Sequence, residues 1–192
     1  SYISLFSSLA TFILSLFVWY SMDYTSADFQ FLEEQSWIND FIKFKLGIDG
    51  ISILFIVLTT LITPICIISC INSVKDRVKE FLIAILILET FMIGVFCSLD
   101  LVVFYLFFEA GLIPMFLIIG VWGGPRRVYS AFKFFLFTLL GSVLMLVAII
   151  AIYWITGTTD VTQNYEIKRP KEYQNLLWVA FFSSFAVNMP MW

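Results

Sequence analysis

The 192 residues are 61% hydrophobic and 13% charged, with a mean hydropathy of +0.97. Globular chains are about half apolar and about a quarter charged, so the composition excludes an ordinary soluble domain and predicts an integral membrane protein. The formal net charge of -3 offers no basic surface for nucleic acid. The chain contains no histidine, so a proton relay here uses carboxylates, lysines and water.

Five apolar stretches are each long enough to cross a membrane, whose hydrocarbon core is roughly 30 Å thick and needs about twenty helical residues. They cover residues 2–21, 51–71, 81–99, 101–122 and 129–155, and a sixth begins near residue 175 and runs to residue 192. The pattern predicts an all-α fold, a polytopic membrane helix bundle of about six transmembrane helices. Because the chain starts inside an apolar stretch without a basic leader, we expect that its beginning is missing.

The connections between these stretches differ in charge. Residues 22–50 are mainly acidic, whereas residues 72–80 and 123–130 carry clusters of lysine and arginine. Short connections rich in these cations prefer the cytoplasmic or matrix side of a membrane. The charge pattern therefore predicts that 72–80 and 123–130 lie inside. Residues 22–50, the short turn at 98–100 and the connection 156–174 are then predicted to lie outside.

Glu109 interrupts an otherwise unbroken apolar stretch that covers residues 101–120. A charged residue at the centre of a membrane helix costs about 2.5 to 3.5 kcal/mol on insertion scales. Such residues face a protein interior or a water-filled path, where the charge serves a function. The sequence therefore predicts that Glu109 lies on a proton or ion pathway. Pro114, which follows five residues later, removes a backbone donor and is expected to loosen the helical turn between them.

Glu89 is predicted to lie at the same depth as Glu109. The two residues stand about ten positions before and after the turn at 99–100. At about 1.5 Å per residue, both lie roughly 15 Å from that membrane surface. Spacing fixes depth and not rotation, so two interpretations of Glu89 stay open. It is a second member of a proton relay that faces Glu109, or it is a glutamic acid that hydrogen-bonds a neighbouring helix.

Lys133 and Asp100 also allow two interpretations each. Lys133 lies about one turn inside its helix, either as a positive partner that tunes Glu109 or as a lysine that extends to the membrane surface beside Arg126 and Arg127. Asp100 stands at the opposite end of the membrane span. It is expected to cap the helix that follows it, and the alternative is a proton entry point.

The sequence contains no glycine-rich nucleotide fingerprint, no P-loop and no cluster of metal ligands. Cys66, Cys70 and Cys97 lie inside apolar stretches and are expected to act as small hydrophobic residues. We therefore expect this chain to bind no cofactor and no metal.

Two segments carry a resemblance to a known family. They are FYLFFEAGLIPMF at residues 104–116 and GGPRRVYSAFKFFLFTLLGS at residues 123–142, and LGIDGIS at 46–52 and FFSSFAV at 181–187 agree with them. Together they resemble the antiporter-like membrane subunits of NADH–quinone oxidoreductase, respiratory complex I, and within that family the type called chain 4 in mitochondria and chain M in bacteria. The resemblance covers essentially the whole chain.

The resemblance implies a larger fold and a role for particular residues. The family fold is a bundle of about fourteen helices with two inverted repeats, each containing a broken helix. Residues 1–192 would form a partial antiporter-like domain, a fragment that runs from the second helix to the start of the broken seventh. Glu109 matches the family's key glutamate, which pairs with a lysine on the broken helix, and Lys133 matches a lysine on the adjacent helix. Asn188 occupies the position of the family's broken-helix lysine, so that step of the relay is absent here.

The same resemblance implies a function in the proton-translocating arm of an enzyme complex. The chain would be a subunit of NADH:ubiquinone oxidoreductase without a redox centre of its own, and NADH, FMN, iron–sulfur clusters and quinone would be bound by partner subunits. Its partners would be other membrane-arm subunits, the lipid bilayer and protons, in the mitochondrial or bacterial inner membrane. Two alternatives stay open. One is a subunit of a multisubunit cation/proton antiporter, and the other is a degenerate, non-transporting remnant, which Asn188 favours.

Overall fold

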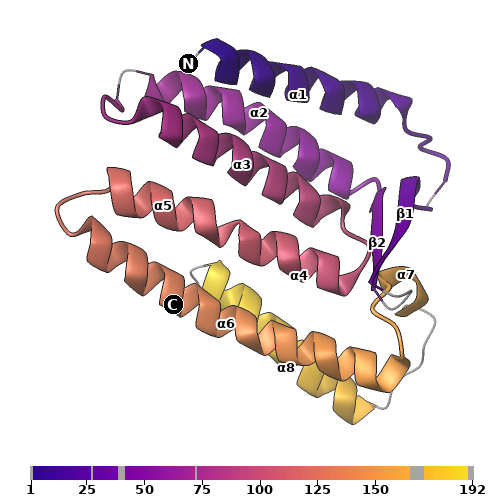
Figure 1. The fold of residues 1–192 in the computed structure, drawn as a ribbon. Coiled ribbons are helices and arrows are strands. Elements are labelled where there is room, and N and C mark those ends of the chain that lie inside the picture. The colour runs from indigo at the N-terminus through magenta and orange to yellow at the C-terminus, as the bar shows by residue number, and fades with distance from the viewer. Residues whose placement is uncertain (1, 27, 39–41, 72, 165–170, 190–192) are drawn as a thin grey trace.

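The computed structural model describes residues 2–26, 28–38, 42–71, 73–164 and 171–189. Most of these residues are helical, and the helices lie side by side roughly in chain order, from α1 at one edge of the molecule to α6 and α8 at the other (Figure 1). The elements are α1 (Tyr2–Ser21), β1 (Gln30–Ile38), β2 (Ile42–Ile48), α2 (Ser52–Cys70), α3 (Val78–Cys97), α4 (Leu101–Ala110), α5 (Leu112–Trp122), α6 (Arg127–Thr156), α7 (Val161–Asn164) and α8 (Lys171–Asn188).

The structure confirms the five predicted membrane spans. Five helical segments in the described part of the chain are long and apolar enough to cross a membrane: α1, α2, α3, the pair α4 and α5 taken together, and α6. The helix at the position of the sixth prediction, α8, begins four residues earlier than expected, at Lys171, and is described as far as Asn188. The last three residues of the sixth predicted span lie outside the described residues.

The strands β1 and β2 pair in antiparallel fashion where the sequence predicted only a polar connection in an all-α fold, and this pair is called the hairpin below. The physical reason is visible in β2, where lysines alternate with apolar residues at positions 43–46, the period of a strand with two different faces. The hairpin packs at one end of the bundle, beside α7 and the turn between α3 and α4 (Figure 1). The backbone N–H of Leu99 in that turn donates to the carbonyl of Lys45 in β2 at 3.0 Å.

Small and polar side chains let the helices approach each other closely. Ser15 of α1 and Thr60 of α2 form a buried hydrogen bond of 2.8 Å. Where α6 crosses α8, a Cβ added to Gly141 would lie 2.8 Å from the Cβ of Val187, so only glycine fits without displacement. Such contacts are typical of helix packing in membranes, where apolar burial does not by itself bring helices together.

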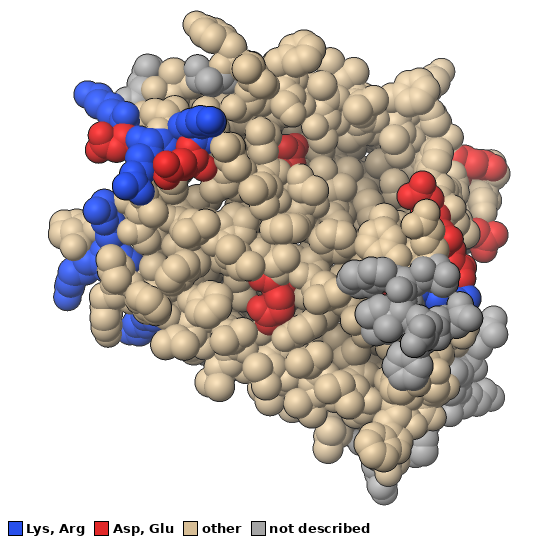
Figure 2. Space-filling model, viewed as in Figure 1, with Lys and Arg blue, Asp and Glu red and all other residues tan. Residues whose placement is uncertain are grey.

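Most charged side chains gather at the two ends of the bundle, and two smaller acidic patches lie between the ends (Figure 2). The cations of residues 72–80 and 123–130 meet at one end, where Lys75, Arg77 and Arg127 line one cavity. The hairpin, the turn at 98–100 and the segment after α6 meet at the other end, where Lys45 pairs with Asp160. This grouping confirms which connections share a side. Which side is cytoplasmic or matrix stays a prediction.

Candidate functional site

Glu109 lies at the end of α4, where α4 meets α5. Gly111 between the two segments keeps helical dihedral angles, with φ of −62° and ψ of −24°, and its N–H donates to the carbonyl of Phe107 at 3.2 Å, so the helical span 101–122 continues through it. Pro114 has no N–H to donate to the carbonyl of Ala110, and its ring crowds that carbonyl. Within this turn the weakening is limited to the Ala110 carbonyl, which lies one residue from Glu109, and a wider loosening of the turn stays a prediction.

The Glu109 carboxylate faces α6 rather than α3. The side chain of Tyr105, one turn earlier on α4, interacts with both Glu109 and Ser142 of α6. Ser142 is fully buried, and its hydroxyl donates to the carbonyl of Leu139 at 3.0 Å. Oε1 of Glu109 is buried, and no hydrogen-bond partner for it exists among the described residues. A buried carboxylate oxygen without a partner is expensive unless it is protonated or meets water.

Glu89 lies at the depth of Glu109, as predicted, but points to a different neighbour. Two close contacts show which residues of α3 are level with Glu109. Gly111, two residues after Glu109, lies beside Leu88, with 3.9 Å between a Cβ added to it and the Leu88 side chain, and Gly94 lies against the ring of Phe107. The Glu89 side chain is 5% exposed and interacts with Thr63 of α2. Its Oε1 is buried and has no hydrogen-bond partner among the described residues, as is true of Glu109, so both interpretations of Glu89 stay predictions.

Lys133 does not reach Glu109 within the described structure. Its side chain is exposed, and the ion pairs between described residues do not include it. The ring of Phe116 in α5 packs against Phe132 and Phe135, whereas Tyr105 in α4 is level with Ser142. Lys133 is therefore level with Phe116, seven residues from Glu109, or roughly 10 Å along the helix axis.

Asn188 lies near the depth of Glu109, at the end of α8. Its neighbour Val187 packs on Gly141, the residue before Ser142. The Asn188 amide donates to the carbonyl of Ser184 at 2.9 Å. Asn188 also lines an apolar cavity of about 780 Å³, together with aromatic side chains of α3, α4, α6 and α8. The amide thus occupies a position where a longer cationic side chain would have room to extend.

At the hairpin end, Asp100 caps α4 as predicted. Its Oδ1 accepts hydrogen bonds from the N–H groups of Val102 and Val103 at 2.8 and 3.2 Å. Its Oδ2 accepts a short hydrogen bond from Thr159 at 2.5 Å. Both carboxylate oxygens are therefore engaged, and this favours capping over the alternative of a proton entry point.

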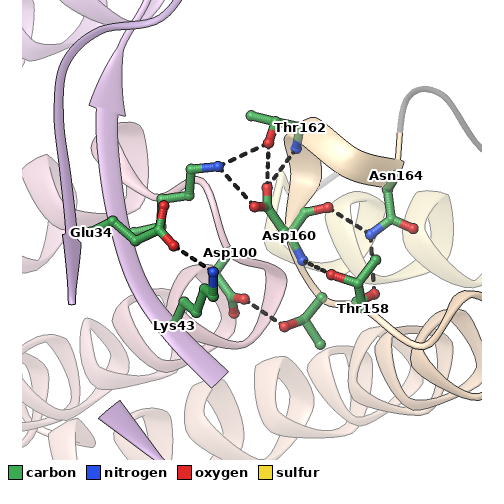
Figure 3. Close-up of polar contacts among 9 residues, drawn as sticks. Glu34, Lys43, Asp100, Thr158, Asp160, Thr162 and Asn164 are labelled. Carbon is green, nitrogen blue, oxygen red and sulfur yellow. Dashed lines mark hydrogen bonds and ion pairs between the residues drawn. The ribbon is translucent and has the colours of Figure 1, made fainter. Parts of the chain in front are cut away.

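A neighbouring ion pair was not anticipated from the sequence. Lys45 of β2 donates to Asp160 at 2.8 Å and to Thr162 at 2.9 Å (Figure 3). Burial alone would raise the pKa of Asp160, but hydrogen bonds from Lys45 and Thr162 outweigh it and hold that pKa below its ordinary value. Together with Asp100 and Thr159, these residues form what we call the hairpin clasp.

Tyr105, Ser142 and Thr63 were also missed. Tyr105 had a usable signal, because residues four apart share one face of a helix. Ser142 and Thr63 are contacted from other helices, and their rotation toward the carboxylates is not encoded in local spacing. Within the described residues, no group of three or more cysteine or acidic side chains is placed to hold a metal ion.

Two family models together match nearly the whole chain. Residues 1–95 match the amino terminus of NADH-ubiquinone oxidoreductase chain 4, and residues 98–192 match the transmembrane domain of the NADH:quinone oxidoreductase and Mrp antiporter family. NADH-quinone oxidoreductase subunit M of Rhodobacter capsulatus is 52% identical over the whole of this chain. The chain spans 40% of the length of that relative.

Solved structures show the same fold. A chain of respiratory complex I from Thermus thermophilus superposes with a TM-score of 0.82 at 27% identity, over 95% of this chain and 38% of that one. A chain of the Mrp complex from Dietzia has a TM-score of 0.80 at 16% identity, over 94% of this chain and 20% of that one, and it is similar in fold alone. This protein is a multi-pass integral membrane protein that belongs to the chain 4, or subunit M, family of antiporter-like NADH–quinone oxidoreductase subunits.

Proposed function

We propose that this chain is part of the proton-translocating membrane arm of NADH:ubiquinone oxidoreductase, with Glu109 as its protonatable centre. The observation that carries the proposal is the buried carboxylate oxygen of Glu109, which has no partner among the described residues and lies next to the Ala110 carbonyl that Pro114 leaves without a helical donor. A carboxylate in that position is poised to exchange a proton with water that enters this turn. Tyr105 and Ser142 provide hydroxyls on the α6 side, along which a proton passes onward.

The proposal places residues 1–192 within a longer antiporter-like domain, from its second helix to the start of the broken seventh. It also places NADH, FMN, the iron–sulfur clusters and quinone in partner subunits, within a mitochondrial or bacterial inner membrane. The support is the family membership and the fraction of the relative's length that this chain spans, 40%. Large exposed apolar side chains, among them Leu140 and Trp154, leave faces for lipid and for further helices.

Lys133 is assigned an indirect role in the same proposal. At roughly 10 Å along the axis from Glu109, its charge acts through intervening water or further helices rather than through an ion pair. Glu89 contacts Thr63 of α2, on the side of α3 that faces away from α4, and is assigned a secondary role in proton transfer.

The test is Glu109→Gln in the intact subunit of the assembled enzyme in vesicles. We expect NADH oxidation with an artificial acceptor to continue, while coupled proton pumping is lost, because the amide cannot release a proton. Glu80→Gln is the matched control, since Glu80 is exposed at the bundle end and should leave pumping unchanged. Full pumping by the Glu109 variant would remove the proposed role.

A second candidate is a subunit of a multisubunit cation/proton antiporter, which the fold of the Mrp complex favours. Co-purification distinguishes the two: flavin and iron–sulfur subunits accompany a complex I subunit and not an antiporter. A third candidate is a non-transporting remnant, which Asn188 favours because its amide stands at the position of the family's broken-helix lysine. The encoding DNA tests this candidate, because an open reading frame beyond Trp192 that supplies the remaining helices would exclude a remnant.

A further inference from the structure

The end of the bundle opposite the hairpin contains a cavity of about 750 Å³ between two loops. One loop connects α2 to α3, and the other connects α5 to α6. Lys75, Arg77 and Arg127 line the cavity with positive charge, and Asp76 is the acidic residue in its wall. Figure 2 shows basic side chains gathered at this end of the molecule.

The cavity wall is built by specific contacts. The indole Nε1 of Trp122 donates to the backbone carbonyl of Asp76 at 2.8 Å, which joins the two loops. The ring of Phe81 packs edge-on against Trp122, with centroids 5.1 Å apart. Nη1 of Arg127 donates to the carbonyl of Val121 at 2.7 Å, which holds the guanidinium at the wall. A guanidinium has five N–H donors, so this bond leaves capacity for a ligand.

Two long helices start at this cavity without a side-chain cap. Neither α3, which follows Arg77, nor α6, which follows Arg126, has a side-chain hydrogen bond at its N-cap, in contrast to α4 with Asp100. Uncapped N–H groups and the helix dipole favour an anion at such positions. Arg77 adopts the left-handed conformation, with φ of 49°, which is costly for a bulky residue and concentrates at functional sites.

We propose that this cavity binds the phosphate group of an anionic phospholipid. Lys75 and Arg127 supply most of the charge complement for a phosphate diester, together with the uncapped start of α6, because Arg77 lies 3.8 Å from Glu80 in the first turn of α3. The cavity lies at the ends of membrane-spanning helices, where Trp122 has the position that tryptophans take at lipid–water interfaces. Part of the cavity wall is apolar and is formed by Val74, Val121 and Val128. This wall would contact the glycerol and first methylenes of a lipid, whereas free phosphate has no apolar part to contact it. Basic pockets between membrane helices on the cytoplasmic or matrix side bind such headgroups.

The experiment measures lipid binding to the assembled, delipidated enzyme in phosphatidylcholine nanodiscs that contain spin-labelled phosphatidylglycerol. Wild type is expected to immobilise the anionic probe in preference to spin-labelled phosphatidylcholine. Arg127→Gln and Lys75→Gln should each weaken that binding about fivefold, because each removes a cation that lines the cavity. Asp76→Asn should strengthen it, because it removes the acidic side chain and keeps the backbone carbonyl that Trp122 contacts. A gain of binding cannot be explained by misfolding.

Arg126→Gln and Lys79→Gln are the matched controls, since these neighbouring cations do not line the cavity, and binding should be unchanged. The proposal is overturned if Arg126→Gln lowers binding as much as Arg127→Gln, which would indicate a general surface charge effect. It is also overturned if inorganic phosphate binds with the same dependence on Arg127 and Asp76 while phosphatidylglycerol does not. Loss of an acidic partner subunit on substitution of Arg127, with lipid binding intact, would assign the cavity to a protein contact instead.

Discussion

At the scale of single residues, the two membrane carboxylates share a depth and differ in surroundings. Glu89 is enclosed between α3 and α2, with Thr63 as its neighbour, and its Oε1 is buried without a partner among the described residues, as that of Glu109 is. Glu109 differs in lying beside the Ala110 carbonyl, which Pro114 leaves without a helical donor, with a tyrosine and a serine toward α6. A carbonyl without a helical donor binds water, and this makes Glu109 the better candidate for proton exchange.

Tyr105 offers a test of the proton path that keeps Glu109 intact. Tyr105→Phe removes the hydroxyl that interacts with Glu109 and Ser142. A hydrogen bond of this kind contributes about 0.5 to 1.5 kcal/mol, so we expect the pumping rate of the assembled enzyme to fall roughly two- to tenfold. Tyr129→Phe is the control, because Tyr129 is an exposed residue near the start of α6. Equal pumping by both variants would exclude the hydroxyl from the path.

The hairpin clasp allows a comparison of two lysines on one strand. Lys45 and Asp160 are 13% and 7% exposed, whereas Lys43 and Glu34 are 42% and 45% exposed. Lys45→Met leaves a buried carboxylate and should destabilise the clasp by about 3 kcal/mol. Lys43→Met should cost less than about 1 kcal/mol. Hydrogen exchange at the Leu99 amide, which donates to the Lys45 carbonyl, reports the difference. Similar protection in both variants would show that burial of the pair is unimportant.

The clasp also has a defined dependence on pH. The pKa of Asp160 is lowered in the folded protein, so its ion pair adds stability at pH values above the ordinary value of 3.8. That contribution is lost as the pH falls through the lowered folded pKa. Protection of the Leu99 amide, corrected for intrinsic exchange, should therefore be constant near neutrality and decline below about pH 4. Asp160→Asn should remove this decline, and a decline of equal size in that variant would contradict the assignment.

At the scale of secondary structure elements, close approach at glycine decides how α8 sits on α6. A side chain at Gly141 meets Val187 at 2.8 Å, whereas one at Gly124 meets nothing within 4 Å. Gly141→Ala is expected to separate the helices and cost about 1 to 3 kcal/mol, as overpacking does. Gly124→Ala is the matched control and should be nearly neutral. Thermal unfolding of the assembled complex measures both, and equal melting temperatures would contradict the crossing that Figure 1 shows.

Sequence patterns predicted the elements better than their contacts. Apolar length identified the five spans within a few residues, since the bilayer fixes helix length. The hairpin was missed because the acidic charge of residues 22–50 suggested a polar connection, although positions 43–46 alternate with the period of a strand. The pair of Lys45 and Asp160 was missed because 115 positions separate the two residues. The rotation of Glu89 was left open by the sequence because spacing gives depth, while packing of neighbouring helices sets rotation.

At the scale of the whole molecule, charge separates the two ends of the bundle, and the basic end is predicted to face the cytoplasm or matrix. Single cysteines introduced at Lys79 and Glu34, in a background without Cys66, Cys70 and Cys97, test this in sealed vesicles. An impermeant maleimide added from the cytoplasmic or matrix side should label position 79 and not position 34. Labelling of position 34 alone would reverse the topology.

Glu109 is proposed to change protonation during turnover, and infrared difference spectroscopy of the assembled enzyme measures such a change at a carboxyl group. On addition of NADH, we expect a carboxyl band in the wild-type spectrum that persists in Glu89→Gln and is absent in Glu109→Gln. A band that stays unchanged in the Glu109→Gln enzyme would show that Glu109 keeps one protonation state.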